Sequence, residues 1–245
     1  NGRRGARNAD GNTPAEFNLP RYFREGRNRL DLILTQPSDS APLESWKEAG
    51  AAPGVTDTWI MSQPTMRVRD VLTKCWPSND GDGTAVAEVG IVVKSSALNP
   101  RTSRIYYDLL TPSGETAATG YKELTLDMRR EDTLRFVTRI PAQLLWSAEL
   151  PTLYTLRLKT QHEGRFGEYL ELPLGFRTVA TDPQGHMTIN GQPVRLHAYE
   201  INPQIVSANL LARLRELGFN TLKFMPGYTP PELLEMCDIQ GVHVG

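Results

Sequence analysis

Apolar and polar side chains alternate with a period of two in ten segments of the chain before residue 177, which is the pattern of half-buried β-strands. The alternation predicts strands over residues 13–19, 29–34 and 57–62, and then over residues 66–76, 84–94, 104–110, 116–126, 134–140, 153–159 and 167–176. In residues 66–76 it places Met66, Val68 and Leu72 on one face and Val71 and Cys75 on the other. The last seven strands predict an immunoglobulin-like β-sandwich of about 100 residues, although the Cys…Trp…Cys pattern of antibody domains is absent.

Between residues 174 and 200 the sequence pattern changes from one typical of successive β-strands to one typical of alternating strands and helices. Asn190-Gly191 is typical of a type I′ hairpin turn, because both central residues of that turn need a positive φ. Residues 206–217 then carry leucines at helical spacing and end at Gly218, and Pro230-Pro231 opens a second helix that ends at Gly241. With strands over 220–224 and 242–244, the order strand, helix, strand, helix, strand predicts a parallel sheet.

Composition excludes several partners. The formal net charge is -1, so the chain has no basic surface that would attract nucleic acid or an anionic membrane. The sequence has no run of 18 or more apolar residues that could span a membrane. Cys75 and Cys237 are too few for a disulfide framework and are interpreted as free buried thiols. The chain opens on Asn1-Gly2, a turn pair without a preceding strand and without a signal peptide, so we expect an interior cut.

Five motifs occur in an order that resembles glycoside hydrolase family 2, the family of β-galactosidases, β-glucuronidases and β-mannosidases. They are Thr13-Pro-Ala-Glu-Phe-Asn-Leu with Glu25-Gly-Arg-Asn-Arg-Leu, Gly54-Val-Thr-Asp-Thr-Trp-Ile-Met, Leu145-Trp-Ser-Ala-Glu-Leu-Pro-Thr-Leu-Tyr, Gly175-Phe-Arg and Asn190-Gly-Gln-Pro. The third motif is the most specific. Each motif alone is weak, and their order makes the resemblance strong.

The resemblance implies three domains. Residues 1–64 would be the C-terminal part of a jelly-roll sugar-binding domain, residues 65–180 the immunoglobulin-like sandwich, and residues 181–245 the truncated start of a TIM-barrel catalytic domain. It also implies retaining hydrolysis of O-glycosidic bonds by two glutamates about 5–5.5 Å apart. In the family these glutamates follow later barrel strands, so we expect no catalytic residue in this chain and no turnover by the chain alone.

Accessory sugar-site residues follow from the same resemblance. Ser38-Asp39 resembles the loop whose aspartate reaches the sugar in β-galactosidases, with a plain surface aspartate as the alternative. Glu200 stands in the place of a His-Glu-His-His-Pro motif, with His197 and Tyr199 before it, and Lys223 stands where the family often has an arginine. These departures count against a lactose-type β-galactosidase.

The physical case for these residues rests on their location at the carboxyl ends of barrel strands, which face the catalytic mouth. A carboxylate, a cation and an aromatic ring there can hold sugar hydroxyls. A strand-end salt bridge between Glu200 and Lys223 is an equally good interpretation. Among the tryptophans, loop-borne Trp46 is the candidate for stacking on sugar, whereas Trp59, Trp76 and Trp146 are interpreted as core.

No spacing among His162, His186 and His243 indicates a metal site. The resemblance leaves Mg²⁺ or Na⁺, a homo-oligomer, and an exported or periplasmic location open, and it implies a carbohydrate substrate. The alternative function is a non-catalytic carbohydrate-binding or structural β-module.

Overall fold

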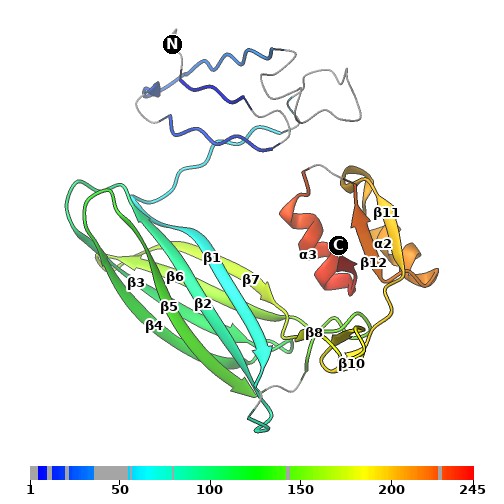
Figure 1. Ribbon diagram of the computed structural model, residues 1–245. Coiled ribbons are helices and arrows are strands. Elements are labelled where there is room, and N and C mark those ends of the chain that lie inside the picture. The colour runs from blue at the N-terminus through cyan, green and yellow to red at the C-terminus, as the bar shows by residue number, and fades with distance from the viewer. Residues whose placement is uncertain are drawn as a thin grey trace. The chain divides into compact units, whose positions relative to one another are not determined.

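A computed structural model describes residues 5–9, 13–19, 22–35, 55, 57–78, 80–141, 144–225 and 228–245 (Figure 1). The chain divides into two compact units, residues 1–61 and residues 62–245.

The strands predicted in the first unit are not formed in the part that the structure describes. Residues 13–19, 29–34 and 57–62 contain no strand, and Phe17, Leu32 and Ile33 are 43%, 55% and 88% exposed. Alternation produces a strand only where a neighbouring strand completes the hydrogen-bond ladder, and no ladder is formed in these segments. The turn predicted around Gly26 is closed by the Asn28 side chain, which accepts from the Arg24 backbone N–H at 3.0 Å. The jelly-roll assignment therefore remains a prediction.

The seven strands predicted in the second unit are all present. They are β1 (Met66–Pro77), β2 (Thr84–Ser95), β3 (Arg101–Leu110), β4 (Thr116–Leu126), β5 (Glu131–Pro141), β6 (Tyr154–His162) and β7 (Arg165–Leu174). They form two antiparallel sheets, ordered β1-β2-β5 and β4-β3-β6-β7 (Figure 1). One apolar core joins the two sheets, with Ile91, Leu109 and Leu158 at most 1% exposed. We call residues 66–174 the sandwich.

A bulge in β1 corrects the predicted faces of that strand. The register against β2 shifts between Val68 and Asp70, so Met66 and Val68 face the core while, beyond the shift, Val71 and Cys75 pack against the same core. Leu72, predicted to share a face with Val68, is 50% exposed. One extra residue reverses the alternation, because the side-chain period of a strand is two.

A three-stranded antiparallel sheet follows the sandwich. It contains β8 (Val179–Thr181), β9 (Met187–Ile189) and β10 (Gln192–Pro193) in the order β10-β9-β8. Asn190 and Gly191 connect β9 to β10 with φ values of 52° and 76°. The predicted hairpin turn, with two positive φ angles, is therefore confirmed.

The chain ends in a parallel β/α region, as predicted. Its elements are β11 (Ala198–Ile201), the 3₁₀ helix η2 (Pro203–Ile205), α2 (Ala208–Glu216), β12 (Thr221–Phe224), α3 (Pro231–Gln240) and β13 (His243–Val244). The sheet order is β11-β12-β13 with parallel pairing throughout. We call residues 198–244 the parallel unit.

The helices of the parallel unit pack on one face of its sheet. Leu211 and Leu214 of α2, together with Leu233 and Cys237 of α3, share a core with Leu222 of β12. Two leucines predicted on the apolar helix faces lie outside this core: Leu217 is 61% exposed and Leu234 is 42% exposed. Leu217 is the C-cap residue of α2, so this helix ends one residue earlier than predicted.

Trp146 joins the sandwich to the parallel unit. Its side chain is 1% exposed, and its indole Nε1 donates to the backbone oxygen of Asp238 in α3 at 2.8 Å. The Arg177 guanidinium lies 4.3 Å from the Trp146 ring centroid and pairs with the Asp238 carboxylate at 3.3 Å. Trp146 is core, as predicted, whereas Trp59 is 82% exposed, so its interpretation as core is wrong.

Three of the sequence motifs meet at this tryptophan. The Trp146 backbone N–H donates to the Phe176 oxygen at 2.9 Å, and the Asn190 side chain donates to the Trp146 oxygen at 3.0 Å. A Cβ on Gly175 would lie 3.3 Å from the Trp146 side chain. The motifs at residues 145, 175 and 190 therefore form a single structural joint.

Candidate functional site

The candidate site lies on the face of the parallel sheet opposite its two helices. Glu200 and Lys223 are directly opposite each other in the β11–β12 register, and Lys223 Nζ donates to Glu200 Oε2 at 3.2 Å. Their side chains are 50% and 64% exposed. Since neighbouring residues of a strand face opposite ways, this pair projects away from the face that α2 and α3 cover.

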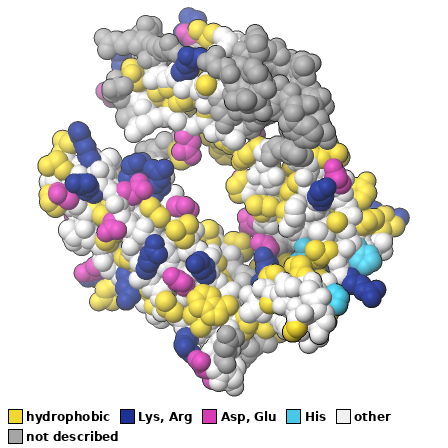
Figure 2. All heavy atoms as spheres, in the orientation of Figure 1, with side chains coloured by type: hydrophobic (Ala, Val, Ile, Leu, Met, Phe, Trp, Pro, Cys, Tyr) yellow, Lys and Arg dark blue, Asp and Glu magenta, His cyan; other side chains and the backbone are white. Residues whose placement is uncertain are grey.

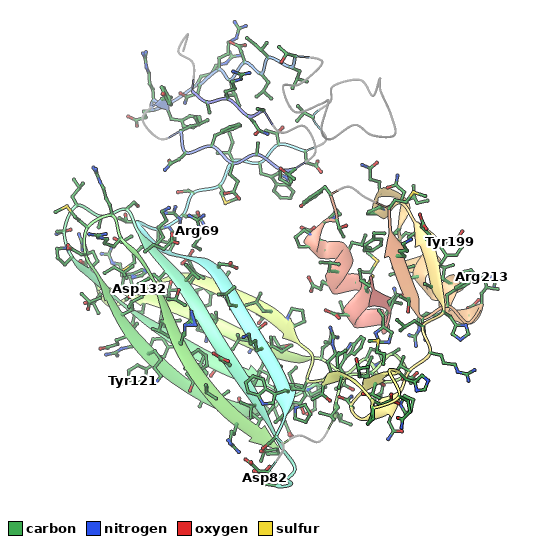
Figure 3. All side chains as sticks on the ribbon, viewed as in Figure 1. Arg69, Asp82, Tyr121, Asp132, Tyr199 and Arg213 are labelled. Carbon is green, nitrogen blue, oxygen red and sulfur yellow. The ribbon has the colours of Figure 1, made fainter. Side chains whose placement is uncertain are left out.

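Tyr199 lies on the other face of the same strand. It is opposite Leu222 in the register, and Leu222 belongs to the core under the helices. The Tyr199 ring makes an edge contact with Phe219, with centroids 5.3 Å apart, and the residue is still 41% exposed. Figure 3 labels Tyr199 at β11. The structure therefore brings Glu200 and Lys223 together and separates Tyr199 from them.

His197 precedes β11 and is held through its backbone. Its N–H donates to Asn220 Oδ1 at 2.8 Å, while the Asn220 side-chain amide donates to the Arg195 oxygen at 2.8 Å. Asn220 thus fixes the entry to β11 just before β12 begins, a role that no sequence pattern indicated. Asp39 and Trp46 lie outside the described residues.

Within the described ranges, no group of three or more His, Cys, Asp or Glu side chains is arranged to hold a metal ion. The Mg²⁺ or Na⁺ implied by the resemblance has no such ligand set in this part of the chain. None of the helices in the described residues is both long and apolar enough to cross a membrane.

A groove of about 1010 Å³ lies at the sandwich, far along the chain from Glu200. Charged residues of both signs line it, among them Arg101, Arg104, Glu123 and Arg165. Figure 2 shows the same mixture over the visible face of the sandwich, where basic and acidic side chains are interspersed. Such a surface has no strong single-sign field, so it fits a neutral ligand better than a polyanion.

A buried polar cluster lies under one end of this groove. Glu168 of β7 accepts the backbone N–H of Val68 at 2.8 Å, next to the β1 bulge. Burial raises the pKa of the Glu168 carboxyl, and the Val68 hydrogen bond opposes that shift. Ser103 Oγ and both ring nitrogens of His162 are buried with no hydrogen-bond partner among the described residues. No sequence motif marked this cluster, because its members come from separate strands.

An antiparallel sandwich joined to a parallel β/α unit defines a mainly β protein, and comparisons with known proteins show what it is similar to. The profile of glycosyl hydrolases family 2 matches residues 66–177. The chain is 28% identical over 259 residues to β-galactosidases of Yersinia pestis and Yersinia pseudotuberculosis, an alignment that covers 96% of this chain and 24% of each relative.

Solved structures show the same fold. A Bacteroides uniformis β-glucuronidase superposes with a TM-score of 0.64 at 18% identity, over 74% of this chain and 24% of that one. A putative β-galactosidase from Bacteroides fragilis gives a TM-score of 0.63 at 16% identity, over 71% of this chain and 27% of that one.

These matches confirm the resemblance drawn from the sequence and support a fragment of glycosyl hydrolases family 2. The chain spans about a quarter of the length of the relatives it matches. Those named relatives, the β-galactosidases and the β-glucuronidase, are glycoside hydrolases.

Proposed function

We propose that this chain is part of a retaining β-glycosidase acting on O-glycosidic bonds, with both catalytic glutamates outside it. Residues 1–64 supply the end of a jelly-roll domain, residues 65–180 an immunoglobulin-like sandwich, and residues 181–245 the first strands and helices of a (β/α)₈ barrel. The β-galactosidases among the relatives support a sugar substrate.

The observation that carries the proposal is the Glu200–Lys223 pair. It lies on two parallel strands, on the sheet face opposite the helices. In a (β/α)₈ barrel that face is the interior, and its carboxyl end is where substrates bind. A carboxylate and an ammonium at 3.2 Å present one acceptor and one donor to neighbouring hydroxyls of a sugar.

His197 lies before the amino end of β11, beside the Asn220 clamp, so it is at the end of the strand away from the proposed mouth and is a site candidate by the family resemblance alone. Tyr199 contributes indirectly, because its contact with Phe219 supports β11 from the helix side. Asp39 and Trp46 remain candidates from the first unit.

The test uses the whole enzyme that contains this chain, assayed on aryl β-galactosides and β-glucuronides. Glu200→Gln and Lys223→Ala should each lower kcat/KM by about ten- to a hundredfold, the cost of one or two lost hydrogen bonds to substrate. The matched control is Arg213→Ala, which removes a 2.6 Å exposed ion pair with Glu216 on α2 and should leave kcat/KM unchanged.

Unchanged kinetics in Glu200→Gln would reduce the pair to a strand-end salt bridge. A whole protein that binds saccharides without hydrolysing any aryl glycoside would favour the alternative, a non-catalytic carbohydrate-binding or structural β-module.

A further inference from the structure

Aromatic rings gather on the outer face of the four-stranded sheet. Tyr121, Tyr106, Phe166 and Tyr169 form a chain of neighbouring rings, with successive centroids 5.8, 6.1 and 6.1 Å apart. Tyr121, Phe166 and Tyr169 are 55%, 52% and 65% exposed. Figure 3 shows Tyr121 on β4 at the outer side of the sandwich. We call these four residues the aromatic row.

The strand register builds this row. Tyr121 of β4 is opposite Tyr106 of β3, Tyr106 is opposite Lys159 of β6, and Lys159 is opposite Tyr169 of β7. The rings of β4, β3 and β7 and the Lys159 side chain of β6 therefore lie at one level of the sheet, because directly opposite residues share a face of a sheet.

A second bulge adds the fourth ring. The β6–β7 register shifts between Lys159 and Gln161, so that Lys159 is opposite Tyr169 while Gln161 is opposite Phe166. Residues three apart in a regular strand face opposite ways, yet here both Phe166 and Tyr169 face outward. The ring contact between them at 6.1 Å confirms that they share a face. Bulges that re-aim side chains are over-represented next to functional sites.

Paired polar groups surround the rings. The Tyr106 hydroxyl donates to Gln161 Oε1 at 3.0 Å, and Arg104 donates to Glu123 at 2.7 Å through its Nε. On the other side of the row, Arg157 pairs with Glu171 at 2.5 Å. By the strand register this face also carries Lys159 and Asp108, so three cations (Arg104, Arg157 and Lys159) and three carboxylates (Asp108, Glu123 and Glu171) balance on it.

Two hollows adjoin the row. The groove of about 1010 Å³ includes Phe166, Arg104, Glu123 and Gln161 in its lining. A smaller hollow of about 170 Å³ is lined in part by Tyr169, Lys159 and Glu171. A ligand lying along the rings would therefore reach polar groups at both ends.

We propose that the outer face of the β4-β3-β6-β7 sheet is an accessory binding surface for a neutral, β-linked oligosaccharide. The apolar faces of pyranose rings would lie on the aromatic row, and their hydroxyls would bind the surrounding amide, guanidinium and carboxylate groups. This surface is separate from Glu200 and does not require the proposed hydrolytic activity.

A saccharide fits this face better than a protein partner does. The cores of protein interfaces are depleted of Lys, Glu and Asp, whereas here Glu123 and Glu171 flank the rings on both sides and Lys159 lies among them. A polyanion is also disfavoured, because Arg104 and Arg157 each already bind a carboxylate. An electroneutral ligand with many hydroxyls matches an electroneutral face with rigid donors and acceptors.

The test is an NMR titration of the ¹⁵N-labelled 245-residue chain with cellotetraose and with β-1,4-galactotetraose. We expect saturable shifts confined to β3, β4, β6 and β7 with at least one of the two. The double variant Tyr121→Ala/Tyr169→Ala should weaken binding at least tenfold, while Leu72→Ala and Val137→Ala, 50% and 63% exposed on the other sheet, should not change it.

Three results would overturn the proposal. Neither neutral tetrasaccharide shifts these strands; the acidic oligomer tetragalacturonate binds and the neutral ones do not; or the chain self-associates in sedimentation and the double variant restores the monomer. Glu200→Gln should leave the titration unchanged, so failure of the hydrolytic proposal and failure of this one give different results.

Discussion

The sandwich and the parallel unit bury their sheets in different ways. Each sheet of the sandwich covers the other, and their shared core includes residues at 0% exposure such as Val89 and Leu109. The parallel sheet is covered by helices on one face, and its other face carries Glu200 and Lys223. Parallel sheets are normally covered on both faces, so the parallel unit depends on neighbouring structure in a way that the sandwich does not.

The joint at Trp146 is where the second region gains support from the first. Removing the indole in Trp146→Ala deletes a 1% exposed side chain and its 2.8 Å bond to Asp238. We expect a loss of about 3–5 kcal/mol in the free energy of unfolding, the range for large-to-small substitutions of buried aromatics. Urea unfolding followed by circular dichroism measures it.

The control for this variant is Trp59→Ala, which truncates an 82% exposed tryptophan and should change stability by less than about 0.5 kcal/mol. If Trp146→Ala behaved like Trp59→Ala, the sandwich and the parallel unit would not be coupled through this residue.

Gly241, at the end of α3, lies close against the backbone of Ala148 at the joint. Gly241 has a φ of 68°, and a Cβ there would collide with the backbone oxygen of Ala148. Gly241→Ala should therefore cost about 1–3 kcal/mol from backbone strain alone, and more from the clash. Hydrogen exchange should show the loss in α3 and β13 first, with the sandwich protected.

Gly218→Ala separates the two contributions. Gly218 has a φ of 90°, but a Cβ added there would meet no atom of the described residues within 4 Å, so this variant carries the strain without the clash. Equal losses in the two variants would show that the contact with Ala148 adds nothing.

Glu168 gives the sandwich a pH dependence of its own. Burial raises its pKa, so the protonated form is favoured in the folded state. The protonated carboxyl therefore adds to the free energy of unfolding. This contribution is complete below the ordinary glutamate pKa of about 4.3, and it is lost as the pH rises through the higher pKa of the folded state. Glu168→Gln keeps an acceptor for the Val68 N–H and removes the charge.

Relative to Glu168→Gln, the wild-type chain should therefore lose stability as the pH rises above the ordinary glutamate pKa of about 4.3. Thermal unfolding at several pH values in this range measures the difference. A gap between the two proteins that stays constant with pH would contradict the assignment.

The smallest expected effect concerns the two cysteines. Burial raises the pKa of the Cys75 and Cys237 thiols to about 11, which leaves about one thiol in a thousand ionised at pH 8. Alkylation by iodoacetamide should be slow for both residues in the folded chain and fast in urea, as mass spectrometry can show. Fast native labelling of Cys237 alone would indicate that α3 opens independently of the sandwich.

The sequence predicted the sandwich strands and the parallel unit well because their partners lie within the same chain. Leu30 and Leu32 show the same alternation as Val89 and Ile91, yet only the second pair is buried. The difference lies in strand pairing, because β2 has a strand on each side. The period of apolar residues along a segment does not indicate whether a neighbouring strand will pair with it.

The bulges, and the side-chain directions that they set, could not be predicted from the sequence for a related reason. The shift at Val68 and the shift opposite Gln161 each reverse which side chains face outward, and no residue type marks them. Glu200 and Lys223 could be placed on neighbouring strand ends from the sequence, and the structure pairs them. The separation of Tyr199 onto the helix side follows from the face that Ile201 and Leu222 bury.

The most direct test of the central proposal is an assay of the purified 245-residue chain, at high concentration, on aryl β-galactosides and β-glucuronides. We predict no release of the aryl group above the uncatalysed rate, because our proposal gives Glu200 and Lys223 a role in sugar binding only and places both catalytic glutamates outside this chain. Saturable turnover that Glu200→Gln abolishes would contradict this account and make Glu200 a catalytic residue.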